Sequence, residues 1–220
     1  MIPELHLTPS RTGTLRDPSN RLVQAAAAQV YPTSNLQRLL RMLSGIPKPH
    51  ILDLGRLSGA NIEFMIQKGF KVYVDDRISD LKPAPPPPPP SRSEKKRPAP
   101  EPLEPLEYEP GLFDAVLCWD IFDYLVAKQA QELVGGIAKA LKPKGLLLAF
   151  FYCNRTTSPP PVRYRILQAD QLEYKSLSQE LPRRIYENRE IQELFTGFDT
   201  VNSCFLINQM REVLVQRQLG

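Results

Sequence analysis

Residues that build metal sites and disulfide frameworks are scarce in this chain. Its three cysteines, Cys118, Cys153 and Cys204, lie far apart and form no CxxC pair. This spacing excludes a zinc ribbon and a disulfide scaffold, and it fits a reducing compartment. Long apolar runs are missing as well. The longest extends only from Leu146 to Tyr152, far short of the ~20 residues that a membrane-spanning helix needs.

The chain also lacks an excess of charge of one sign. Its 28 basic and 24 acidic residues give a formal net charge of +4, which does not indicate a nucleic-acid partner. Glu4 and His6 stand where a secretory signal peptide carries a basic residue followed by an apolar stretch. We therefore expect a soluble, cytoplasmic protein with no membrane partner and no metal site.

Proline, in contrast, is concentrated in one segment. Twelve of the 23 prolines fall between Pro83 and Pro110. Because proline lacks an amide donor and has a fixed φ, this segment can be neither helix nor sheet interior. The run Pro85–Pro90 is expected to form a polyproline II rod. The segment has almost no large apolar side chains, so we predict a disordered insert over residues 83–110.

This insert divides one domain into two halves. We place the first half at 34–82 and the second at 111–220. Residues 1–33 are expected to form an N-terminal tail with a short helix over the run Gln24–Gln29, which contains four consecutive alanines.

Outside the insert, strand and helix patterns alternate. An apolar strand at 50–54, a glycine-containing turn, an amphipathic helix and a second strand at 71–74 predict a right-handed βαβ unit with parallel strands. Further strands are expected at 113–119 and 146–152, with a helix between them. The alternating segments at 200–207 and 212–217 are too close for a parallel crossover, so they predict an antiparallel hairpin. The fold class is therefore α/β, with a Rossmann-like, mostly parallel sheet, helices on both faces and a reversed C-terminal strand.

Four motifs in this order resemble those of class I S-adenosylmethionine-dependent methyltransferases. Residues 51–61, ILDLGRLSGAN, resemble the first motif, in which an acidic residue at a strand end precedes a glycine-rich loop. Asp76 stands at the end of the second strand, at the family's usual spacing from Asp53. Residues 113–116, FDAV, resemble the family's fourth strand, and residues 141–147, LKPKGLL, resemble the turn into its fifth strand.

The resemblance implies a site for S-adenosylmethionine at the carboxyl ends of the strands. Gly55 and Gly59 would let the loop turn sharply and approach the ligand, and Ser58 belongs to the same loop. Asp76 would accept hydrogen bonds from the ribose hydroxyls, and Asp53 would lie near the methionine part. By the same resemblance, the residues just past the fourth strand, Trp119 and Asp120, would contact the adenine edge or the acceptor.

Each of these residues also has a structural interpretation. Asp53 and Asp76 could be ordinary carboxylates at strand ends. Trp119 could be core packing, and Asp120 and Asp123 could supply negative charge to the N-terminus of the next helix. Arg183 and Arg184 are interpreted as solvated charge. No catalytic residue is assigned, because methyl transfer from a sulfonium needs alignment and desolvation more than a dedicated acid or base.

Two departures from the family pattern bear on activity. Leu57 replaces the middle glycine of the loop, and the Pro-rich insert replaces the third strand, which lies at the sheet edge in this topology. The leading hypothesis is a methyltransferase of unknown acceptor. The alternative is a non-catalytic methyltransferase-like scaffold, whose residues Pro87–Arg92 fit a PxxPxR ligand for an SH3-like partner or form a stiff spacer.

Overall fold

The computed structural model describes residues 28–79, 81, 102–155, 160–177, 181, 183–206 and 208–219. In chain order, the described elements are β1 (Gln29–Pro32), α1 (Ser34–Leu43), β2 (His50–Asp53), α2 (Gly59–Gln67), β3 (Lys71–Val74), β4 (Phe113–Trp119), the 3-10 helix η1 (Ile121–Tyr124), α3 (Ala127–Ala140), β5 (Leu141–Tyr152), β6 (Val162–Gln168), β7 (Gln171–Ser176), α4 (Asn188–Leu194), β8 (Phe198–Phe205) and β9 (Met210–Arg217). No helix within these ranges is long and apolar enough to cross a membrane.

The larger sheet has the strand order β3-β2-β4-β5-β9-β8. Strands β3, β2, β4 and β5 are parallel, and β9 runs antiparallel to both β5 and β8. The predicted Rossmann-like sheet with a reversed C-terminal strand is therefore confirmed, and so is the C-terminal hairpin. β3 lies at the edge of the sheet, and none of the described residues forms a further strand beside it.

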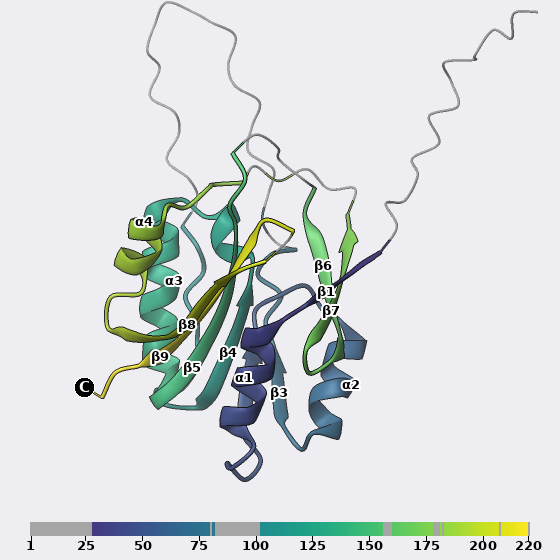
Figure 1. The fold of residues 1–220 in the computed structure, drawn as a ribbon. Coiled ribbons are helices and arrows are strands. Elements are labelled where there is room, and N and C mark those ends of the chain that lie inside the picture. Colours follow the sequence, from purple (N-terminus) through teal and green to yellow (C-terminus); the bar gives the residue numbers. More distant parts are fainter. Residues whose placement is uncertain are drawn as a thin grey trace, which may run out of the picture.

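Helices cover both faces of this sheet, with α3 and α4 on one side and α1 and α2 on the other (Figure 1). The alternation of side chains along the strands explains why two separate core clusters form. In β2, for example, Leu52 packs in the cluster built by α3 and α4, whereas Ile51 packs in the cluster built by α1 and α2. The central strand β4 is buried along its whole length, as its apolar sequence predicts.

A smaller antiparallel sheet of order β1-β7-β6 packs near the first turn of α2. Asn61 in that turn donates from Nδ2 to the Tyr164 carbonyl at 3.1 Å, and its Oδ1 accepts from the Ile166 amide at 2.8 Å. The predicted N-terminal helix is wrong where it reaches described residues. Gln29 begins a strand that pairs with β7, because Pro32 cannot continue a helix and the residues between them are β-formers. Residues 24–27 lie outside the described residues.

The prediction of a disordered insert over residues 83–110 is wrong for its last nine residues. Residues 102–110 are described, and three of their side chains pack against the core cluster on the α3 and α4 side: Leu103, Leu106 and Tyr108. Arg77 holds the same stretch by donating to the carbonyls of Glu104 and Pro105 at 2.6 and 3.2 Å. The last nine residues of the segment therefore belong to the folded domain. Residues 83–101 lie outside the described part of the chain.

Candidate functional site

The βαβ unit brings the residues of the first motif to the carboxyl edge of the sheet. β2 ends at Asp53, the loop follows, and α2 begins at Gly59. Ser58 caps α2, since its hydroxyl accepts from the Asn61 amide at 3.4 Å. A Cβ atom added at Gly59 would meet nothing within 4 Å, so the space above the first turn of α2 is open.

Asp53 is held by two hydrogen bonds from within the chain. Its Oδ1 accepts from the Gly55 amide at 2.9 Å and from Nε1 of Trp119 at 2.6 Å. The residue is 5% exposed. Burial raises the pKa of its carboxyl to about 6, although the two hydrogen bonds oppose the shift. The carboxylate predicted to lie near the methionine part of a ligand is therefore buried and already bonded to an indole.

Trp119 covers the glycine of this loop. A Cβ atom added at Gly55 would lie 2.1 Å from Cδ1 of the Trp119 indole, so the ring rests directly on the glycine backbone. Tyr164 of β6 stacks on the indole with centroids 5.0 Å apart and an interplanar angle of 13°. Trp119 is 2% exposed and has a positive φ of 48°, which is rare for a bulky residue. Gly55 is needed here because the indole approaches it, and the indole occupies the face of the loop that the resemblance assigns to a ligand.

Asp76 also bonds to the loop. Its Oδ2 accepts from the Leu57 amide at 2.9 Å and from the Ser79 hydroxyl at 2.8 Å, and its Oδ1 accepts from the Ser79 amide at 2.9 Å. The side chain of Leu57 is tolerated in place of a glycine because it faces solvent, with 58% of its surface exposed. Asp75 points elsewhere, as strand alternation predicts, and pairs with Arg77 at 2.8 Å.

Asp120 does not lie in an open site. Its Oδ2 accepts from Nη2 of Arg183 at 2.9 Å, and Asp123 accepts from Nη1 of the same guanidinium at 2.9 Å. The side chains of Arg183, Asp120 and Asp123 are 2%, 1% and 0% exposed. The interpretation of Arg183 as solvated charge is therefore wrong, and its neighbour Arg184 is the one that reaches the surface.

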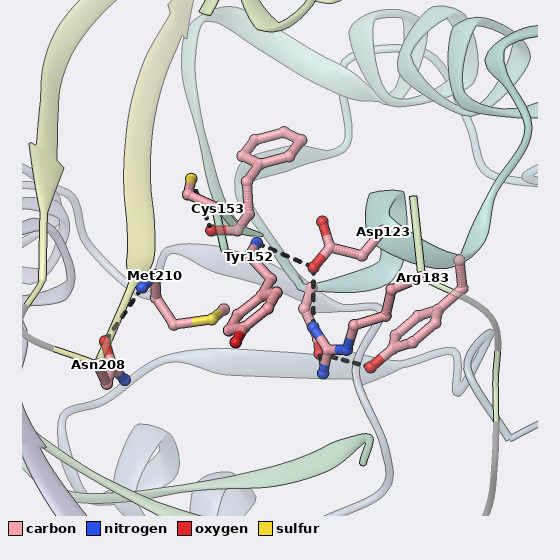
Figure 2. A network of polar contacts seen from close by, with 9 residues as sticks. Asp123, Tyr152, Cys153, Arg183, Asn208 and Met210 are labelled. Atoms are coloured by element: carbon pink, nitrogen blue, oxygen red, sulfur yellow. Dashed lines mark hydrogen bonds and ion pairs between the residues drawn. The ribbon is translucent and has the colours of Figure 1, made fainter. Parts of the chain in front are cut away.

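The carboxyl ends of β4 and β5 meet at this buried ion cluster. Asp123 also accepts from the Tyr152 amide at 3.0 Å, and Figure 2 shows its carboxylate between that backbone and the Arg183 guanidinium. Burial raises the pKa of Asp123 well above its usual range, and the charge of Arg183 opposes the shift. Two buried carboxylates share one guanidinium, so this cluster closes the edge of the sheet beside Trp119.

Other features of the described residues do not complete a cofactor site. A hollow of about 510 Å³ opens beside the end of β3, lined by Asp75, Arg77, Glu104, Pro105, Glu107 and Tyr108. It includes none of the residues that the resemblance assigns to the cofactor. Within the described ranges, no group of His, Cys, Asp and Glu is placed to hold a metal ion.

Comparison with solved structures identifies the fold. A methyltransferase from Mesorhizobium loti matches with a TM-score of 0.50 and 12% identity, over 82% of this chain and 96% of that one. A methyltransferase from Methanosarcina mazei matches with a TM-score of 0.47 and 11% identity, over 79% and 94% of the two chains. The 1,6-didemethyltoxoflavin-N1-methyltransferase of Burkholderia thailandensis, solved with S-adenosylhomocysteine, matches with a TM-score of 0.46 and 13% identity, over 83% and 80%.

This chain has the fold of class I S-adenosylmethionine-dependent methyltransferases. No protein-family model and no curated protein sequence matches it. The structural likeness therefore shows the methyltransferase fold alone.

The residues present do not fit the cofactor in the arrangement that the methyltransferase motifs imply. Trp119 lies against Gly55 and bonds to Asp53, so a ligand on that face of the loop would have to displace a buried, stacked indole. The carboxylate of Asp120 is bonded within the protein. The carboxylate of Asp76 is likewise bonded within the protein, and open space is found at Gly59. No strand of the described chain lies beyond β3.

Proposed function

We propose that this chain is a non-catalytic binding protein built on the methyltransferase fold. The single observation that carries the proposal is the position of Trp119, whose indole rests on Gly55 and donates to Asp53. Displacing that ring would leave the buried Asp53 carboxylate without one of its two partners, and it would break the stack with Tyr164. A ligand would have to supply this free energy before gaining any contact of its own.

The surroundings of Trp119 support the same proposal. The side-chain amide of Asn61 donates to β6 through Nδ2 and accepts from β6 through Oδ1. These two hydrogen bonds hold Tyr164 over the indole. On the other side, Arg183 joins Asp120 and Asp123 in a cluster that is almost fully buried. The side chains that cover the loop are thus fixed by elements from both halves of the chain.

Isothermal titration with S-adenosylmethionine and S-adenosylhomocysteine tests this proposal. We expect no heat of binding at ligand concentrations of about 1 mM, which corresponds to a binding free energy weaker than about 4 kcal/mol. Near-UV circular dichroism of the same sample confirms that the aromatic core is folded. Saturable binding of either ligand at micromolar concentration would overturn the proposal.

A second candidate is S-adenosylmethionine-dependent methyl transfer to an unidentified acceptor. It is supported by one observation, which is that Asp76 bonds to the loop at the Leu57 amide, while a Cβ atom added at Gly59 would meet nothing within 4 Å. If titration detects binding, Asp76→Ala should weaken it by about 1.5–3 kcal/mol, the scale of hydrogen bonds to a charged group. Unchanged affinity in Asp76→Ala would mean that another residue binds the ligand. Asp75→Ala is the matched control, because it removes the neighbouring carboxylate.

The binding partner of a non-catalytic scaffold is open to a direct test. Residues Pro87–Arg92 fit a PxxPxR ligand, and they lie outside the described residues. Titration of the full chain against a set of purified SH3 domains should give binding that Arg92→Glu removes if this segment recruits a protein. Without any such binding, the segment is a spacer.

A further inference from the structure

Among the described residues, β3 has an outer edge with which no strand pairs. The amides of Lys71 and Asp75 donate to the carbonyls of Pro49 and Asp53, so both point toward β2. Since amides alternate along a strand, those of Val72 and Val74 point away from β2. In the parts of the chain that the structure describes, no strand pairs with this side of β3. An open edge with regular geometry is a template for pairing with another chain.

The other strand edges are less regular. β8 carries a register shift between Thr200 and Asn202, and such a bulge disrupts the hydrogen-bonding edge. β1 ends at Pro32, which has no amide to donate. β6, the other edge of the smaller sheet, carries a register shift between Ile166 and Gln168. β3, in contrast, pairs with β2 in continuous register from Lys71 to Val74.

Apolar side chains of β3 and α2 near this edge lie outside the two core clusters. Val72 packs in the core cluster of α1 and α2, so Val74, two residues later, faces the same side of the sheet. On α2, Ile62 and Ile66 are one helical turn apart, and Ile66 is 57% exposed. Val74, Ile62 and Ile66 belong to neither core cluster. The edge therefore offers apolar side chains as well as free backbone groups.

The sequence of β3 is complementary to itself in the antiparallel direction. When the pairing is centred on Tyr73, Val72 lies opposite Val74 of the second copy, and Lys71 lies opposite Asp75. Asp75 also pairs with Arg77 of its own copy at 2.8 Å. Lys71 and Asp75 share one face with Tyr73, and Nζ of Lys71 already lies 5.0 Å from the centroid of that ring. A register shifted by one residue would place Val72 opposite Asp75, so apolar and charged pairs favour the Tyr73-centred register.

We propose that β3 pairs with β3 of a second copy of this chain across a two-fold axis at Tyr73. The two sheets then continue into one, and the exposed flanks of the two α2 helices meet beside the axis. A two-fold interface of this kind uses the same patch on both copies, which matches the self-complementary sequence. The outer edge of β3, with which no described strand pairs, becomes the dimer interface.

Sedimentation velocity of the full chain, from about 1 to 200 µM, tests the proposal. We expect a monomer–dimer equilibrium whose dissociation constant rises about tenfold or more in Lys71→Glu, which places like charges opposite each other. The matched control is Lys175→Glu, which makes the same charge change at an exposed position of β7 and should leave the dissociation constant within about twofold.

A second variant tests the edge itself. Val74→Pro removes an amide that points away from β2, so the sheet within one copy keeps its hydrogen bonds while the dimer should be lost. Amide exchange gives an independent measurement, because Val72 and Val74 should exchange more slowly as the dimer forms. A chain that stays monomeric, a dimer that survives both variants, or slow exchange of these two amides in the monomer would each overturn the proposal.

Discussion

The indole nitrogen of Trp119 donates a 2.6 Å hydrogen bond to the carboxylate of Asp53, across the loop that joins β2 to α2. The two residues stand at the carboxyl ends of neighbouring parallel strands, which explains how side chains 66 positions apart meet. Their contact makes the Gly55 side of this loop part of the protein core. The stability of this contact can be measured without any ligand.

The pH dependence of stability should report on Asp53. Its carboxyl pKa is raised from 3.8 to about 6 in the folded protein, so the folded state binds the proton more tightly than the unfolded state does. The stabilisation from this proton is complete below pH ~4 and is lost as the pH rises through about 6, which amounts to about 3 kcal/mol. Asp53→Asn should remove this change, because a neutral amide oxygen can still accept from Trp119 and Gly55.

Urea unfolding of the wild type and Asp53→Asn between pH ~4 and ~7 measures the difference. The free energy of unfolding should fall with rising pH more steeply in the wild type than in the variant. Because other titrating groups are common to both proteins, they cancel in the comparison. Parallel pH profiles would show that Asp53 is not the buried acid described above.

Gly55 in the loop and Gly59 at the start of α2 should respond differently to the same substitution. Gly55→Ala places a methyl group 2.1 Å from the Trp119 indole, so we expect a loss of about 1–3 kcal/mol or more. Gly59→Ala is the control, since the site is open and the residue begins α2. It should be neutral or stabilise the protein by a few tenths of a kcal/mol, up to about 1. Thermal unfolding of both variants checks the contrast, and equal losses would contradict the indole position.

The backbone strain at Trp119 can be separated from its packing. Trp119→Ala and Trp119→Gly remove the same ring, so both should lose several kcal/mol, about 3–5 by analogy with other buried aromatics. They differ in backbone preference, because only glycine adopts a φ of 48° without a steric penalty. Trp119→Gly should therefore be more stable than Trp119→Ala by about 1 kcal/mol. The reverse order in denaturant unfolding would exclude a left-handed backbone at this position.

Sequence patterns predicted the parts of this molecule that depend on local spacing. The βαβ unit, the position of Asp53 before the loop and the C-terminal hairpin follow from strand and helix periodicity and from short connections. The contact between Trp119 and Asp53 could not be predicted, because Tyr164 fixes the indole from a hairpin about 45 residues further along the chain. Arg183 and Arg184 look alike in the sequence, and only tertiary packing decides which of them is buried.

These two arginines form a matched pair for testing the buried ion cluster. Arg183→Met leaves two buried carboxylates without their shared cation, so we expect a loss of about 3–5 kcal/mol at neutral pH. The loss should shrink in acid, since burial raises the pKa of Asp123 and its protonation removes an unpaired charge. Arg184→Met breaks a surface pair with Glu190 and should change the stability by less than about 1 kcal/mol. Similar effects of the two substitutions would show that Arg183 is not enclosed.

The Pro-rich segment should divide into two parts with different effects on stability. Residues 102–110 contain Leu103, Leu106 and Tyr108, which pack on the core, so replacing this part with a Gly/Ser linker of equal length should lower the melting temperature by many degrees. Residues 83–101 have no large apolar side chain in their sequence, so the same replacement there should change the melting temperature by a few degrees at most. Differential scanning calorimetry of the two variants gives the comparison. A large loss from replacing 83–101 would mean that this part also contributes to the folded domain, and a negligible loss from replacing 102–110 would contradict its packing beneath α3.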